Sequence, residues 1–414
     1  MKISKNTLRK KLFKELSEMY AAEVPLYDKL LETVKYTNKQ AAQQTPELDL
    51  SEKEIEELSS ERHGAIRLGK PEEMAMMARF FNSLDMQPVN FYNLADAGSK
   101  SQPVISTAFR PVKNADHRVF CSLLMTDYFD KETEEKIKNA LKDRQIFSAK
   151  LKALIEISEK EDGLNDIQAK DFINEAKKLF GWRGTAIDYE LYNLMVEKKF
   201  NIAADIACFP NPHLNHLTPN SLDIDLLYSE MNKRFKTDLG ILSAKGMKDS
   251  IEGPPAMKHL VLLRQTSYKA LDEKVEFTNL DGTKISATHT ARFGEIEQRG
   301  IALTPKGRAI YDRLISENKI DYKSFTKELP DNYNELRKQE LAYFKKDSTG
   351  NYKPIRYEDF LPVSAAGIFA SNLSQYGTKS DNESRKKYTK ELLETYMEKK
   401  IIEADDLYKA EALQ

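Results

Sequence analysis

The chain of 414 residues has only two cysteines, Cys121 and Cys208. A disulfide framework needs more than one pair, so the count indicates a reducing compartment. The sequence also lacks any run of about 18 apolar residues, which excludes a transmembrane helix. Residues Met1 to Tyr20 form a charged amphipathic pattern without the apolar core of a secretory signal. The expected location is therefore the cytoplasm.

An excess of charge of one sign is absent as well. Lys and Arg number 64 against 65 Asp and Glu, which gives a formal net charge of -1. A nucleic-acid-binding protein usually carries a basic surface, so the balance predicts no nucleic-acid partner, and we expect no membrane association either. The composition does not indicate an oligomeric state.

Several short motifs with a known chemistry are missing. The sequence has no GxGxxG, no P-loop, no GxSxG and no CxxC pair. Their absence argues against a dinucleotide-binding enzyme, a P-loop nucleotide hydrolase, a serine hydrolase with a nucleophile elbow, and a CxxC zinc or redox protein. These absences do not argue against an enzyme whose metal ion is bound by histidines and carboxylates.

Hydrophobic periodicity predicts mostly helix over residues 1–60. Leu8, Leu12, Leu16 and Tyr20 recur at every fourth position. A further short acidic helix is capped by Asp49 or Ser51, and Ser51 followed by Glu54 resembles a capping box.

Further along the chain, strand and helix patterns cluster rather than alternate. We expect an extended segment at 61–69, a Met-rich helix at 71–84, and strands at 89–94, 104–109 and 118–124. Helices should follow over 131–200, with breaks near Gly163 and Gly181, and then an irregular stretch at 203–219. The last part of the chain should form a hairpin of strands 259–268 and 286–301 around the turn 279–282, and a charged helix within 381–414. The single tryptophan, Trp182, lies beside the second break and is interpreted as a packing residue. The pattern predicts an α+β fold.

Six histidines are present: His63, His117, His213, His216, His259 and His289. Imidazole is the commonest metal ligand, although an arbitrary histidine is more often structural. His63 and Arg67 are four residues apart and share one face of a strand or helix. Arginine binds a carboxylate through two parallel hydrogen bonds, but an ordinary surface ion pair explains this spacing equally well. His213 and His216 lie between prolines, and one or both could bind a metal.

The segment Phe293 to Arg299 lies on the predicted return strand. Alternation places Phe293, Glu295, Glu297 and Arg299 on one face. Two glutamates on one face repel each other unless a cation neutralises them. They are interpreted either as an exposed polar face or as one metal ligand beside an outer-shell or acid/base carboxylate, and the spacing leaves both open. Two histidines and one carboxylate form the ligand set of non-haem Fe(II) oxygenases, and zinc enzymes use the same set.

Five separated segments together resemble the 2-oxoadipate dioxygenase/decarboxylase family, also called 2-hydroxyglutarate synthase. They are Glu61–Gly69, Ser106–Pro111, Asn215–Pro219, Arg292–Gly307 and Tyr357–Phe369. The resemblance covers about residue 55 to 375. It implies a vicinal-oxygen-chelate-like mixed β-sheet core with many added helices. We divide the chain accordingly into a helical segment 1–55, a metal-binding catalytic domain 56–375 with a helical insertion around 131–200, and a C-terminal helix in 376–414.

The resemblance also implies the chemistry and its residues. The expected cofactor is Fe(II), and the expected reaction converts 2-oxoadipate and O₂ to 2-hydroxyglutarate and CO₂ in lysine catabolism. The implied metal ligands are His63, His216 and Glu295; Glu297 is then the second carboxylate, assigned a catalytic role, and stays the rival for the ligand position. The implied substrate-binding residues are Arg67, Val363 and Ser364.

Two alternatives remain. A metal-dependent lyase or isomerase on the same fold would use the same ligands without consuming O₂. A non-catalytic interaction protein could retain the fold, as the helical additions at both ends suggest.

Overall fold

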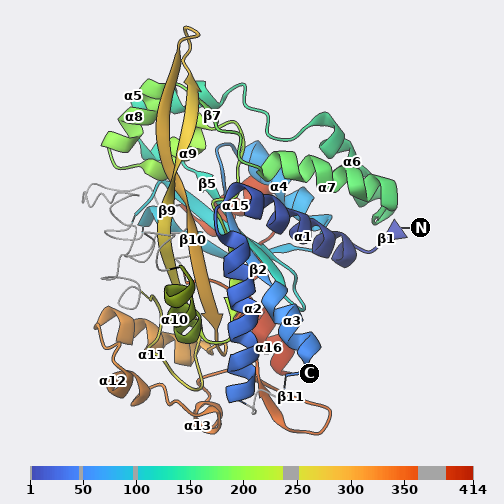
Figure 1. The fold of residues 1–414 in the computed structure, drawn as a ribbon, viewed down its shortest axis with the longest axis vertical. Helices are drawn as coiled ribbons and strands as arrows, with labels where there is room; N and C mark the ends of the chain where they lie inside the picture. Colours follow the sequence, from blue (N-terminus) through green and yellow to red (C-terminus); the bar gives the residue numbers. More distant parts are fainter. Residues whose placement is uncertain (1, 46–49, 97–100, 236–250, 362–387, 414) are drawn as a thin grey trace.

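A mixed β-sheet runs through the centre of the molecule. The computed structural model describes residues 2–45, 50–96, 101–235, 251–361 and 388–413. Within them the sheet has eight strands (Figure 1), in the order β3 (Gln87–Asn93), β4 (Val104–Arg110), β5 (His117–Leu124), β2 (Arg62–Leu68), β8 (His216–Ser221), β10 (Lys284–Arg299), β9 (Leu263–Thr278) and β7 (Thr185–Ile187).

The sheet consists of two similar halves that meet at β2 and β8. In one half, β2 leads into helix α4 (Pro71–Asn82) and then into β3, β4 and β5, and β5 returns parallel to β2. In the other half, β8 leads into α10 (Ile224–Phe235) and the β9–β10 hairpin, and β10 lies parallel to β8. The two first strands pair antiparallel. The predicted α+β class, with a mixed β-sheet core and many added helices, is confirmed.

Alternation along β2 separates a hydrophobic face from a polar one. Ile66 and Leu68 belong to a large hydrophobic cluster, whereas Ala65 belongs to a different cluster on the opposite face. Successive strand residues point to opposite sides, so His63 and Arg67 share the face of Ala65. Every residue of β2 is buried, which places these two polar side chains inside the protein.

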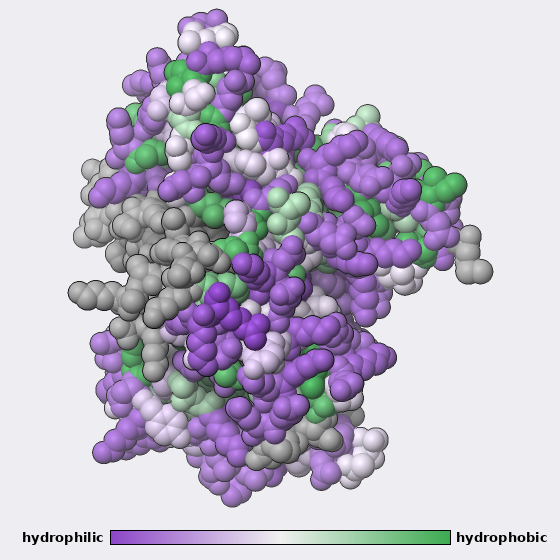
Figure 2. Space-filling view, viewed as in Figure 1, coloured by the Kyte–Doolittle hydropathy of each residue, from purple (hydrophilic) through white to green (hydrophobic). Residues whose placement is uncertain are grey.

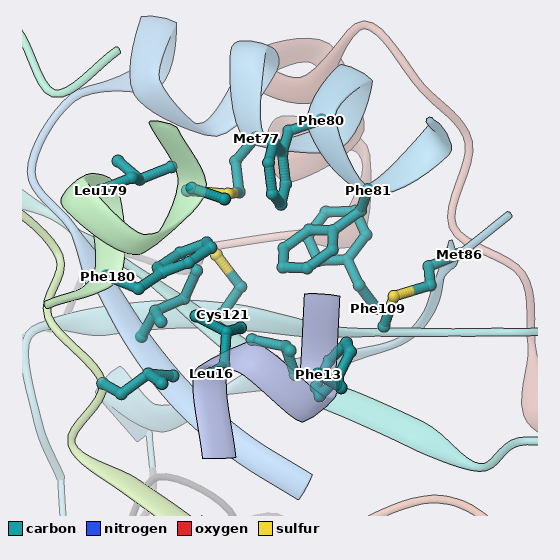
Figure 3. Close-up of a cluster of buried hydrophobic side chains, with 14 of the residues drawn as sticks. Phe13, Leu16, Met77, Phe80, Phe81, Met86, Phe109, Cys121, Leu179 and Phe180 are labelled. Atoms are coloured by element: carbon teal, nitrogen blue, oxygen red, sulfur yellow. The ribbon is translucent and has the colours of Figure 1, made fainter. Parts of the chain in front are cut away.

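The larger hydrophobic cluster lies under helices α1 (Lys5–Glu23), α4 and α7 (Asp166–Phe180). Figure 3 shows Phe13 and Leu16 from α1 beside the aromatic rings of α4 and α7 and the sheet residues Phe109 and Cys121. Phe80 and Phe172 stack with ring centroids 5.0 Å apart. The N-terminal helix therefore contributes to the core of the sheet through its predicted four-residue repeat.

The other elements surround this core. The helices are α2 (Tyr27–Gln44), α3 (Glu52–Ser60), α5 (Lys131–Leu141), α6 (Ala149–Glu161), α8 (Tyr189–Glu197), α9 (Asn201–Cys208), α11 (Pro305–Ser316), α12 (Tyr322–Thr326), α13 (Tyr333–Lys338), α15 (Lys390–Met397) and α16 (Ala404–Ala412). Two small sheets pair β1 (Lys2–Ile3) with β6 (Leu164–Asn165) and β11 (Phe344–Lys346) with β12 (Tyr352–Pro354). The predicted capping box of Ser51 and Glu54 is present at the start of α3.

The prediction of an irregular stretch at 203–219 was right for residues 209–215 and wrong on either side of them. Helix α9 continues to Cys208, and β8 begins at His216. Pro210 and Pro212 fall in the short connection between them. Pro219 stands where β8 changes from pairing with β2 to pairing with β10, a position at which a missing N–H disturbs the ladders least.

Two boundaries also differ from the prediction. The first hairpin strand begins at Leu263 rather than at residue 259, because His259 contacts Asp331 instead. The C-terminal segment forms two helices, α15 and α16, where the sequence predicted one; Glu398 has a left-handed backbone that ends the first. The predicted breaks at Gly163 and Gly181 are confirmed.

The face of the molecule seen in Figure 2 is mostly polar. Its hydrophobic groups are small and scattered. Among the described residues, no helix is both long enough and apolar enough to cross a membrane.

Candidate active site

Three neighbouring strands bring His63, His216 and Glu295 together. They lie on β2, β8 and β10, and their side chains are almost completely buried. Nε2 of His63 is 3.1 Å from Oε1 of Glu295, and Nε2 of His216 is 3.4 Å from Oε2 of the same carboxylate. One ligand atom from each residue lies within 4.8 Å of the others, a separation that suits one metal ion. We call these three residues the His63 triad.

Strand register places the two histidines. In the antiparallel β2–β8 pair, Ala65 lies opposite His216 and His63 lies opposite Thr218. The histidines are therefore diagonal neighbours on the pleated sheet, and their rings meet edge to face at 5.1 Å. A strand positions His216 here, rather than the stiff proline-rich loop that the sequence suggested.

Glu297 lies behind His63 rather than within the triad. Its Oε2 is 2.9 Å from Nδ1 of His63. Arg299 donates two hydrogen bonds of 3.0 Å to the same carboxylate and a third, of 2.7 Å, to the carbonyl of Asp359. A carboxylate on the far nitrogen of a ligating histidine fixes the orientation of the ring. The second carboxylate was expected either to orient a metal ligand or to act as an acid/base group, and this geometry favours the first role for Glu297.

The charges of this site are strongly coupled. Burial alone would raise the pKa of Glu297, but Arg299 and His63 hold it well below its usual range, so the carboxylate stays ionised. Burial alone would lower the pKa of His63, but Glu297 and Glu295 together raise it to about 9. Burial raises the pKa of Glu295, and the charge of His63 only partly opposes this. The positive charge near Glu295 therefore does not offset the effect of burial on its carboxylate.

Aromatic rings cover one side of the triad. Phe360 meets the His63 ring edge to face at 5.2 Å and meets Phe120 at 5.6 Å. The residue before it, Asp359, is fully buried and accepts hydrogen bonds of 2.9 and 3.0 Å from Arg110. This buried pair fixes Phe360 against the histidine. The motifs Ser106–Pro111 and Tyr357–Phe369 contain these residues, but the sequence alone indicated no role for Arg110, Asp359 or Phe360.

A second cluster lies next to the triad. Arg67 donates a hydrogen bond of 2.7 Å from Nη1 to Oδ2 of Asp205, on α9. The other oxygen, Oδ1, is 3.3 Å from Nε2 of His213 and 3.2 Å from Nε2 of His289. The three residues Asp205, His213 and His289 are all buried and also have the spacing of a metal site. We call them the Asp205 triad.

Aromatic side chains hold the histidines of the Asp205 triad. Tyr192 Oη lies 3.0 Å from Nδ1 of His289. Trp182 stacks on His289 at 5.9 Å and meets His213 edge to face at 4.8 Å. Trp182 is thus a packing residue, as expected, and it packs both against a hydrophobic cluster that includes Phe209 and against the histidines of the Asp205 triad.

The structure therefore assigns to different triads the histidines that the sequence could not distinguish. His216 joins His63, whereas His213, the other candidate from the same loop, joins His289 and Asp205. His117 and His259 lie elsewhere, beside Asp116 and Asp331. Sequence reasoning missed Asp205 and His289, since neither stands in a recognisable spacing with its partners. Val363 and Ser364 lie outside the described residues.

The inner strands of the mixed sheet carry a buried group of two histidines and one carboxylate, which is the ligand set that non-haem Fe(II) oxygenases use. Comparison with known proteins identifies the family. The model of the 2-oxoadipate dioxygenase/decarboxylase family matches residues 12–372. The chain belongs to this family and is an enzyme.

Individual relatives agree with the family model. The chain is 39% identical to the 2-oxoadipate dioxygenase/decarboxylase of Pseudomonas putida, over 92% of this chain and 91% of that protein. It is 38% identical to the Escherichia coli protein of the same name, over 98% and 96%. The crystal structure of the hydroxyglutarate synthase in complex with 2-oxoadipate from P. putida matches with a TM-score of 0.84 at 34% identity, covering 100% of this chain and 97% of that one.

Proposed function

We propose that this enzyme is an Fe(II)-dependent dioxygenase/decarboxylase that converts 2-oxoadipate and O₂ to 2-hydroxyglutarate and CO₂, as a step of lysine catabolism. The observation that carries the proposal is the buried His63 triad in a chain that resembles the P. putida enzyme over nearly its whole length. The reaction balances, because both oxygen atoms of O₂ enter the two products.

The donor set fits the proposed metal. Ligand atoms bound to one ion at about 2.1 Å lie about 3.0 to 3.4 Å apart when the bond angles are near 90° to 110°. The two nitrogen–oxygen distances within the triad are 3.1 and 3.4 Å. Two imidazoles and one carboxylate leave coordination positions for a 2-oxo acid and O₂. Fe(II) bound there supplies the activation of O₂.

The protein's own residues orient the ligands and shape the site. Glu297 holds His63 in the rotation that directs Nε2 toward Glu295. Phe360 and Phe120 exclude water from one side of the triad. Arg67, buried on the same face of β2 as His63, supplies a positive charge for a substrate carboxylate. By family resemblance, Val363 and Ser364 complete the substrate site.

The test is anaerobic loading with Fe(II), followed by O₂ and a panel of 2-oxo acids. We expect 2-oxoadipate to drive O₂ uptake with equal amounts of 2-hydroxyglutarate and CO₂. Zn²⁺- and Ni²⁺-loaded samples serve as controls and should consume no O₂. Turnover without O₂ uptake would establish the lyase or isomerase alternative instead, and inactivity toward every acid would overturn the proposed reaction and leave the fold and the family assignment.

We also propose that the enzyme works in the cytoplasm. Cys121 and Cys208 are both buried free thiols, as expected for a protein of a reducing compartment.

A further inference from the structure

Arg67 is a buried cation on the strand that carries a ligand of the His63 triad. Only 5% of it is exposed, and it follows His63 by four residues, about 13 Å along a strand that rises roughly 3.3 Å per residue. A long arginine side chain at such a position has many rotamers, and it binds a carboxylate well only if one of them is fixed beforehand. Asp205 provides the fixed partner, at 2.7 Å from Nη1.

Asp205 is itself held from several elements. His213 comes from the connection before β8 and His289 comes from β10, and their Nε2 atoms lie 3.3 and 3.2 Å from Oδ1. Asn215, the neighbour of His216, donates a hydrogen bond of 3.4 Å to Oδ2. Because these contacts come from the connection before β8 and from strand β10, and Arg67 adds a contact from β2, Asp205 cannot move without disturbing its surroundings. The Asp205 triad is therefore a rigid support for Arg67.

Charge distinguishes this triad from a second metal site. Among the described residues, the ion-pair contacts of Glu295 are the two histidines of its own triad, whereas Asp205 has the guanidinium of Arg67 in addition to its two histidines. Burial alone would raise the pKa of Asp205, but His213, His289 and Arg67 hold it well below its usual range. A divalent ion there would meet a guanidinium at short range, at a substantial electrostatic cost. The surroundings suit a fixed arginine and an incoming anion better than a metal.

We propose that Asp205 is a positioning residue, which together with His213 and His289 fixes Arg67 to receive the far carboxylate of a dicarboxylic 2-oxo acid. The inference rests on the proposed function, since it assigns the end of the substrate opposite the metal. A guanidinium has five N–H donors, so one hydrogen bond to Asp205 is compatible with a two-point contact to a carboxylate through others. The pair Arg67–Asp205 is neutral without substrate, which makes burial of the arginine tolerable.

The experiment compares two ligands of equal length on the metal-loaded enzyme under anaerobic conditions. 2-Oxoadipate and 2-oxohexanoate differ only in the far carboxylate, and calorimetry measures the dissociation constant of each without turnover. In Asp205→Asn we expect 2-oxoadipate to bind about 10- to 100-fold more weakly, whereas 2-oxohexanoate changes less than about threefold. Metal content should remain the same as in the wild type.

Asp116→Asn is the matched control. It removes a carboxylate that is 3.1 Å from a buried arginine, Arg9, outside both triads, and it should leave both dissociation constants unchanged. If Asp205→Asn does not fold, His289→Asn carries the same prediction with a smaller effect, and Asp205→Glu should restore part of the selectivity.

Three results decide the matter. An equal loss for both acids would overturn the inference and place Arg67 at the metal end of the substrate. Loss of a second equivalent of metal from Asp205→Asn would overturn it in favour of a second metal site. A wild-type enzyme that binds neither acid would overturn the proposed function itself, and the inference with it, which separates that failure from the other two.

Discussion

The molecule contains two buried groups of the same composition. The His63 triad and the Asp205 triad each have two histidines and one carboxylate, and each has its ligand atoms within 4.8 Å of one another. The nitrogen–oxygen distances are 3.1 and 3.4 Å in the first and 3.3 and 3.2 Å in the second. Residue type and spacing alone do not distinguish them.

The difference lies in the outer partners. Nδ1 of His63 contacts the carboxylate of Glu297, whereas Nδ1 of His289 contacts the neutral hydroxyl of Tyr192. Behind the first triad lies the carboxylate of Glu297, itself paired with Arg299, whereas in the second triad the arginine, Arg67, contacts the triad's own carboxylate. Under the two proposals above, similar ligand geometry holds a metal cation in one place and supports a cationic side chain in the other. The surrounding charge, rather than the ligand set, decides which.

The largest expected effect contrasts the two triads directly. His216→Ala should lower Fe(II) affinity by at least about 100-fold and abolish turnover, because losing an outer-shell partner already costs about 10- to 100-fold and a ligand costs more. His289→Ala should keep one equivalent of iron. Metal analysis after anaerobic loading and desalting, with circular dichroism to verify folding, measures both.

His259→Ala is the control for the loss of an imidazole outside both triads. His259 contacts Asp331 instead, and its removal should change neither iron content nor turnover. The comparison of the triads fails if His289→Ala loses iron as His216→Ala does.

A smaller effect concerns the pH dependence of metal loading. A ligating histidine must lose its proton, and the pKa of His63 is raised to about 9 in the metal-free site. The neutral form binds the metal, so apparent affinity should increase with pH and level off above about 9. Binding at pH 7 should be roughly 100-fold weaker than the plateau, at tenfold per pH unit. Fe(II) or Co²⁺ titrations in strictly anaerobic buffers would follow this.

Glu297→Gln tests the cause of that shift. The amide keeps an acceptor for His63 but removes the charge. The midpoint of the pH dependence of metal binding should therefore move down toward the ordinary histidine pKa near 6.5. Glu273→Gln, which removes a carboxylate bound to Arg292, should leave the midpoint in place. A wild-type midpoint near 6.5 would show that Glu297 does not govern the proton on His63.

The sequence predicted the fold class, and the structure brings together the three residues that the family resemblance implied as ligands, His63, His216 and Glu295. Alternation on the return strand placed Glu295, Glu297 and Arg299 on one face, and these three residues do share the site. Distinguishing Glu295 from Glu297 required the structure, because both point inward. Arg299 binds Glu297 and leaves Glu295 for the triad, a contact that the spacing alone could not reveal.

The Asp205 triad could not be predicted in the same way. His289 is six residues before Glu295, and the β9–β10 pairing shifts register between Thr290 and Gly294, so simple alternation does not relate the two residues. Asp205 lies on a helix within a stretch that prolines marked as irregular. Its partners are 8, 84 and 138 residues away, and only tertiary packing brings them together.

The smallest expected effect tests the neutral partner of the second triad. Tyr192→Phe removes the hydroxyl 3.0 Å from Nδ1 of His289. A lost hydrogen bond costs about 1 kcal/mol, so 2-oxoadipate should bind roughly fivefold more weakly while 2-oxohexanoate binding and iron content stay unchanged. The effect stays small because Trp182 and Phe209 still pack against the His289 ring. Tyr189→Phe, on the ring stacked beside Tyr192, is the control and should have no effect. Loss of iron in Tyr192→Phe would mean that the hydroxyl supports a metal ligand, and the two triads would then be alike in function as well as in composition.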